Sequence, residues 1–185
     1  MTSSMPTPTP PPSHTEDERP LIISVIGGGE AQPWANELAE EVGRELAVRG
    51  VTVVCGGMSG VMEAVCRGAK SAGGRTIGVL PGNDPAAANR YVDMPIMTGM
   101  GYARNVIVVK TGRAVIAIDG AYGTLSEIGH ALGDRTPVIG LHTWELPQRE
   151  GLPFEVVQAD SAADAVEKAI AAARKRDARE QARLH

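Results

Sequence analysis

The sequence predicts a single doubly wound α/β domain, with a mostly parallel sheet of about six or seven strands and helices on both faces. Short, β-branched apolar runs alternate with amphipathic helical patterns at the spacing of βαβ units. The runs are apolar throughout, as expected for parallel strands that are buried on both faces. Four of them lead into glycine-containing turns, at 27–29, 56–57, 82 and 120–123.

The first strand is predicted at 21–26 ("LIISVI"), directly before three consecutive glycines. Pro33 suits the first turn of the helix that follows. Apolar residues recur every four positions along this helix and give it one apolar face: Trp34, Leu38, Val42 and Leu46. A second strand at 51–54 and a helix over about 60–72 complete this unit.

The same alternation continues to the end of the chain. A third strand, 76–82, precedes a polar segment at 83–95, which is expected to contain no strand. The later elements are a helix over about 100–111, strand 114–118, helix 124–132, strands 137–142 and 154–157, and a final helix from about 162. Aromatic residues make up only 3% of the chain, so three methionines are expected to fill gaps in the core: Met94, Met97 and Met100.

The 185 residues predict one folded domain over 20–176. Six prolines among the first twenty residues predict a disordered tail at 1–19, and charged residues predict a frayed end at 177–185. The net charge of −4 and the lack of a basic stripe in the body of the chain argue against nucleic-acid binding. We find neither a signal pattern nor a membrane-spanning run, and both cysteines lie in apolar surroundings, so a cytoplasmic protein with reduced thiols is expected.

The glycine turns indicate where a ligand binds. Ligands of doubly wound folds bind at the carboxyl ends of the strands, and bare backbone amides there can approach an anion closely. The dinucleotide fingerprint fails, because Gln32 stands where its third glycine belongs, and no P-loop or nucleophile elbow is present. The turns therefore predict a site for a phosphorylated small molecule.

Three motifs give the chain a family resemblance. "GGMSGVMEAVCRGAKSAGGRTIGVLPG", "GMGYARNVIVVKTGRAVIAI" and "GAYGTLSE" resemble the LOG-type (Lonely Guy) superfamily of Rossmann-like proteins, over residues 20–175. The branch containing molybdenum-cofactor carrier proteins is the more similar one. The resemblance implies a homodimer or homotetramer. Some relatives are labelled lysine decarboxylases, a chemistry that nothing in this sequence supports.

Enzymes of this superfamily are phosphoribohydrolases with the motif PGGxGTxxE and an Arg-Lys pair on the preceding helix. Five residues of this chain match that pattern: Arg104, Gly120, Gly123, Thr124 and Glu127. Three depart from it: Asn105 replaces the lysine, Asp119 the proline and Ala121 the second glycine. Asparagine after the arginine is similar to the carrier branch. The departures favour binding over hydrolysis.

The predicted site comprises the residues of these turns and motifs. Glu127 and Arg104 are the catalytic candidates if the protein is an enzyme, and no metal ligands are predicted. The ligand-binding candidates are Gly28, Gly29, Gly57, Met58, Ser59, Gly82, Asn105, Asp119, Gly120, Ala121, Tyr122, Gly123 and Thr124. The helix dipole is expected to hold a phosphate on the amides of 120–124 and to keep Glu127 ionised.

Structural explanations compete for four of these residues. Thr124 and Glu127 have the spacing of a helix capping box, and Ser59 suits a helix N-cap. Arg104 could instead form a surface salt bridge.

The sequence therefore predicts a binding protein for a phosphorylated nucleotide- or pterin-like molecule. No cofactor is required, although the molybdenum cofactor or a nucleotide would be a suitable ligand. The alternative is a nucleoside 5′-monophosphate phosphoribohydrolase of the cytokinin-activating LOG type. A weaker alternative is a nucleotide-sensing module that acts through a protein partner.

Overall fold

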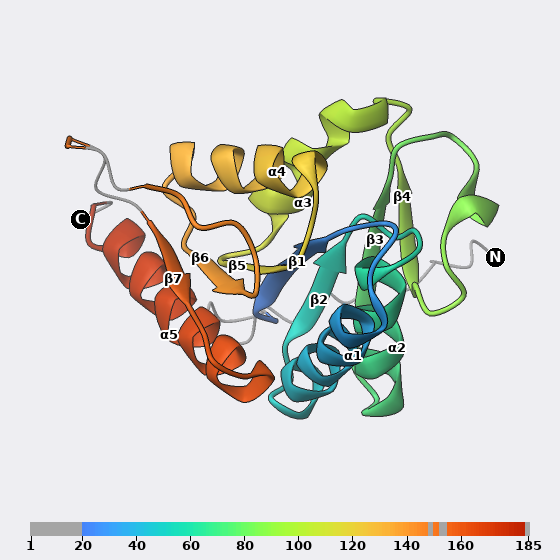
Figure 1. The fold of residues 1–185 in the computed structure, drawn as a ribbon, viewed down its shortest axis with the longest axis horizontal. Helices are drawn as coiled ribbons and strands as arrows, with labels where there is room; N and C mark the ends of the chain where they lie inside the picture. The colour runs from blue at the N-terminus through green and yellow to red at the C-terminus, as the bar shows by residue number, and fades with distance from the viewer. Residues whose placement is uncertain (1–19, 148–149, 152–154, 184–185) are drawn as a thin grey trace, which may run out of the picture.

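The structure, a computed structural model, describes residues 20–147, 150–151 and 155–183. It confirms the doubly wound α/β fold, with seven parallel strands in the order β4-β3-β2-β1-β5-β6-β7 (Figure 1). The strands are β1 (Ile22–Gly27), β2 (Thr52–Cys55), β3 (Thr76–Leu80), β4 (Met94–Met97), β5 (Val115–Ile118), β6 (Val138–Leu141) and β7 (Val156–Gln158).

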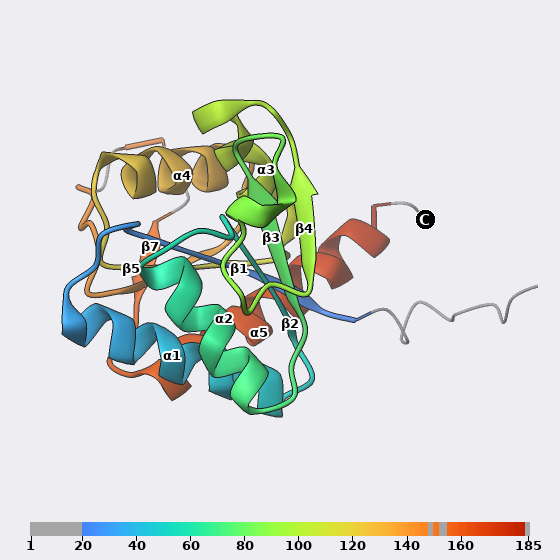
Figure 2. The same ribbon diagram turned by 90° about the vertical axis from the view of Figure 1, so that its right-hand side faces the viewer.

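Helices cover both faces of the sheet. One face carries α1 (Pro33–Val48), α2 (Val61–Ser71) and α5 (Ala162–Gln181), and the other carries α3 (Asn105–Thr111) and α4 (Tyr122–Gly133) (Figures 1 and 2). Two short 3₁₀ helices, Pro85–Ala87 and Gly101–Arg104, lie in the connections on either side of β4. No helix among the described residues has the length and hydropathy needed to cross a membrane.

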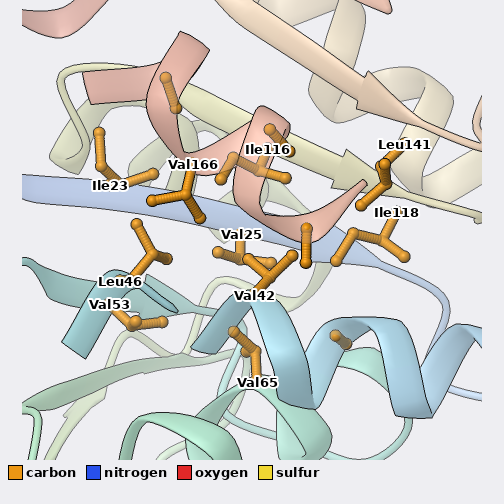
Figure 3. Close-up of a cluster of buried hydrophobic side chains, with 14 of the residues drawn as sticks. Ile23, Val25, Val42, Leu46, Val53, Val65, Ile116, Ile118, Leu141 and Val166 are labelled. Carbon is orange, nitrogen blue, oxygen red and sulfur yellow. The ribbon is translucent and has the colours of Figure 1, made fainter. Parts of the chain in front are cut away.

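Successive residues of β1 point to opposite faces, as the pleat of a strand requires. Ile23 and Val25 join the core under α1, α2 and α5, whereas Ile26 joins the core under α3 and α4. Figure 3 shows Val42 of α1 and Val166 of α5 beside the first of these cores. Both cores consist of small and aliphatic side chains.

The order of the strands reverses at β1, which pairs with β2 on one side and β5 on the other. The helix after β1 lies on one face of the sheet and the helix after β5 lies on the other, so the connections separate at the carboxyl ends of these two strands. Such a switch point is where doubly wound folds bind ligands.

The segment from 83 to 111 corrects the sequence predictions. Met94–Met97 form an edge strand, β4, that pairs only with β3, although no strand was expected before residue 95. Met94, Met97 and Met100 are 59%, 45% and 49% exposed, so the prediction that they fill the core is wrong. Met94 and Met97 lie on the strand at the edge of the sheet, and Met100 lies beyond it, directly before the 3₁₀ turn. The helix predicted over 100–111 divides into the 3₁₀ turn Gly101–Arg104 and α3.

The remaining boundaries are close to the predicted ones. Helix α4 begins at Tyr122, two residues earlier than expected. The predicted strand at 154–157 corresponds in part to β7, and its residue 154 lies outside the described residues, as does the tail at 1–19. Helix α5 continues to Gln181, and Asp177 and Glu180 near its end pair with Arg113.

Candidate functional site

Two glycine turns come together at the carboxyl edge, beyond β1 and β2. The amide of Val61, the first residue of α2, donates to the carbonyl of Gly28 at 3.1 Å. The hydroxyl of Ser59 donates to the carbonyl of Gly29 at 2.9 Å. A Cβ on Gly60 would lie 2.3 Å from the Gly28 oxygen, so only glycine permits this approach. The two turns therefore form one continuous backbone surface.

Ser59 does not cap α2. The N-cap of that helix is Gly60, at φ +65°, and no side chain bonds to it. The serine hydroxyl instead links the two turns across the sheet edge. The prediction that Ser59 is an N-cap is thus wrong, because a contact distant in sequence has taken its hydroxyl.

Arg104 lies on the floor of the site and is only 8% exposed, which excludes a surface salt bridge. Its Nη1 donates to Oδ1 of Asn105 at 2.5 Å, whereas its Nε is buried without a hydrogen-bond partner among the described residues. The guanidinium packs over Gly56, where a Cβ would lie 2.7 Å from Nη2. An unpaired buried donor is costly, and a ligand acceptor would relieve that cost.

Glu127 faces Arg104 from α4 and is 6% exposed. Its Oε1 lies 3.9 Å from Nη1 of Arg104, which is too long for a direct hydrogen bond. Burial raises the pKa of Glu127 to about 7, and the positive charge of Arg104 only partly opposes this. Desolvation of the carboxylate outweighs the favourable charges, so Glu127 is less readily ionised than an exposed glutamate, contrary to the prediction that the helix dipole keeps it ionised.

The capping box is also absent. The N-cap of α4 is Ala121, which has no capping side chain, and Thr124 is already the third helical residue. Thr124 is 3% exposed and packs against Gly120, where a Cβ would lie 2.4 Å from its hydroxyl oxygen. The first-turn amides of α4 have no intrahelical acceptor, and no side chain caps them. They are suited to receive an anion.

Asp119 connects β5 to this helix in an unusual backbone conformation, with φ +49°. Its amide donates to the carbonyl of Leu141 at 3.3 Å, and its own carbonyl accepts from the hydroxyl of Thr143 at 2.6 Å. The ring of a proline fixes φ near −65° and removes the amide hydrogen. The proline of the hydrolase motif could therefore not occupy this turn as it stands.

Three other predicted residues have different roles around the Arg104–Glu127 pair. Met58 is 37% exposed at the rim, and Asn105 holds the guanidinium. Gly82 lies farther along the sheet, after β3, and its carbonyl accepts from Gly99.

Sequence reasoning missed two supports of the site. The side-chain amide of Asn89 donates to the carbonyl of Met58 at 2.9 Å, and its backbone amide donates to the carbonyl of Gly57 at 2.8 Å. Thr143 and Trp144, after β6, bond to the backbone of the turn before α4. No local pattern marks these residues, since each acts through a contact distant in sequence.

Comparison with known proteins identifies the family. The SLOG cluster4 family matches residues 20–175, and the chain belongs to that family. The solved structure of a molybdenum cofactor binding protein from the phototrophic bacterium Rippkaea orientalis is 38% identical, with a TM-score of 0.77. The match covers 83% of this chain and 97% of that one. The molybdenum cofactor carrier protein of Chlamydomonas reinhardtii is 35% identical at a TM-score of 0.73, over 83% and 98% of the two chains.

Similarity also extends to enzymes. The cytokinin riboside 5′-monophosphate phosphoribohydrolase of Mycobacterium tuberculosis is 38% identical over 101 residues. That match covers 53% of this chain and 54% of the enzyme. The chain is thus similar both to carrier-like proteins and to phosphoribohydrolases, as the motifs predicted.

Proposed function

We propose that this member of the SLOG cluster4 family is a binding protein for a phosphorylated nucleotide- or pterin-like small molecule. The observation that carries the proposal is the buried Arg104, whose Nε has no partner among the described residues. A guanidinium fixed in this way is prepared to bind phosphate or carboxylate through two parallel hydrogen bonds. The uncapped first turn of α4 supplies amide donors for the same anion.

Asn105 and Asp119 support binding rather than turnover. Asn105 fixes Nη1 of Arg104 and leaves one fewer cation in the site than an Arg-Lys pair would supply. The turn at Asp119 has a backbone conformation that the proline of the hydrolase motif cannot adopt. Similarity to molybdenum cofactor binding and carrier proteins over most of the chain agrees with this proposal.

Ribose 5-phosphate is a suitable first probe, because it presents a phosphate and hydroxyls without a ring system. Calorimetric titration of the wild-type protein should detect binding, and Arg104→Lys should weaken it at least tenfold, because lysine cannot form the bidentate contact. Arg90→Lys, at an exposed arginine before β4, is the matched control and should bind as the wild type does. Absence of binding to the wild-type protein, or equal binding by both variants, would contradict the proposal.

The second candidate function is hydrolysis of a nucleoside 5′-monophosphate, and the apposition of Glu127 and Arg104 favours it. A carboxylate beside the sugar could stabilise an oxocarbenium-like transition state, as in glycoside hydrolysis. Incubation with a panel of nucleoside 5′-monophosphates, followed by chromatography, would detect free base and ribose 5-phosphate. Base release by the wild-type protein that disappears in Glu127→Gln would establish an enzyme. Release by the wild-type protein no greater than that of Glu127→Gln would favour the binding protein instead.

A further inference from the structure

Three of the five aromatic side chains that the structure describes are exposed, and the other two pack only partly buried against the cores. Of the six aromatic residues in the sequence, five lie in the described part of the chain, and none of these is fully buried. Tyr102 is 90% exposed, Tyr122 is 81% exposed and Trp34 is 44% exposed. Single exposed rings are common on protein surfaces, so a ligand contact has to be inferred from how a ring is supported and where it lies.

Tyr122 and Trp144 form an aromatic pair beside the candidate site. Their ring centroids are 6.1 Å apart with an interplanar angle of 32°, within the range of offset aromatic contacts. Trp144 is held in place, because its Nε1 donates to the carbonyl of Ala121 at 3.3 Å and its ring packs on the core under α4. Tyr122 therefore rests on a fixed support.

Tyr122 is also the first residue of α4, so its amide belongs to the uncapped turn proposed to hold the anion. A ligand whose phosphate lies on this turn is therefore bound next to the Tyr122 side chain. The other aromatic contact near the site has a different geometry. Trp34 meets His142 edge to face, with centroids 5.7 Å apart and planes at 82°.

We propose that Tyr122, supported by Trp144, is the stacking platform for a planar heteroaromatic ring of the ligand. The inference rests on the proposed function, since it assumes that the phosphate lies at the α4 turn and the Arg104 guanidinium. It adds that the affinity for the ring comes from Tyr122 rather than from contacts to the phosphate. The inference thereby assigns the flat ring of the proposed nucleotide- or pterin-like ligand to one named side chain.

The test compares two probes that differ by the ring alone: adenosine 5′-monophosphate and ribose 5-phosphate. Titration calorimetry of the full chain gives the ratio of their dissociation constants, with chromatography to verify that the nucleotide stays intact. Base–aromatic stacking predicts a ratio of about 5 to 140 in favour of the nucleotide. Tyr122→Ala should bring this ratio close to one, because it weakens adenosine 5′-monophosphate more than ribose 5-phosphate. Tyr122→Phe should keep the ratio, because the stacking ring remains.

Tyr102→Ala is the matched control, since Tyr102 is also largely exposed and has no aromatic partner among the described residues. A ratio of the two dissociation constants in Tyr102→Ala equal to that of the wild-type protein supports the inference. Equal affinities of the wild-type protein for both probes, an unchanged ratio in Tyr122→Ala, or equal weakening of both probes would overturn the inference while the proposed function stands. Failure of ribose 5-phosphate to bind the wild-type protein would instead count against the anion site, and so against the proposed function.

Discussion

Glu127→Gln should change the dependence of stability on pH, because Glu127 titrates differently in the folded and unfolded chain. Burial raises its pKa from 4.5 to about 7. Below pH 4.5 the carboxyl is neutral in both states and costs nothing. Between these two values the folded state binds the proton that the unfolded state has lost, so rising pH progressively lowers the free energy of unfolding. Above pH 7 the loss is complete.

The expected size follows from the same pKa shift. One pKa unit corresponds to about 1.4 kcal/mol, so the full cost of ionising buried Glu127 is about 3 kcal/mol. Part of that cost is already present at pH 5, which leaves about 2 to 3 kcal/mol between pH 5 and pH 8. Glutamine has nearly the same shape and does not titrate. The free energy of unfolding of Glu127→Gln, relative to the wild type, should therefore rise by this amount over the interval.

Urea unfolding followed by circular dichroism at pH 5 and pH 8 measures this difference directly. Glu37→Gln, at an exposed glutamate of α1, controls for the loss of a carboxylate in general and should show no such rise. A difference between Glu127→Gln and wild type that stays constant from pH 5 to pH 8 would refute the assignment of a neutral, buried acid at this position.

Three further predictions concern Gly56, Ser24 and Asp119. Gly56→Ala should leave the fold intact but weaken ribose 5-phosphate binding about tenfold in calorimetry, because the new methyl group displaces Arg104. Gly133→Ala is the control and should not weaken binding, because a Cβ there meets nothing within 4 Å. Ser24→Ala should lower the free energy of unfolding by about 1 to 3 kcal/mol in urea titrations, because the buried hydroxyl makes two hydrogen bonds between β1 and the region of α3. Asp119→Pro, which restores the residue of the hydrolase motif, should cost about 3 kcal/mol or more by the same method, and an unchanged stability would show that the turn relaxes freely.

The sequence was sufficient to predict the layers of the fold and the edge that carries the site. Runs such as 21–26 and 114–118 are apolar on both faces, and few other structures accommodate such strands between amphipathic helices. The edge strand β4 escaped prediction because it contains Pro95 and exposes Met94 and Met97. Its only partner is β3, and pairing of this kind leaves no periodic signal in the strand itself.

The same limit applies to individual side chains of the site. Thr124 and Glu127 have the spacing of a capping box wherever the helix begins, so the local pattern cannot tell a cap from a buried acid. What decides is the start of α4 at Tyr122, which places Thr124 against Gly120 and turns Glu127 toward Arg104. Once Glu127 no longer caps the helix, the first-turn amides of α4 are left without a side-chain acceptor. The burial that raises the pKa of Glu127 and the freedom of those amides to bind an anion therefore have a common origin in where this helix begins.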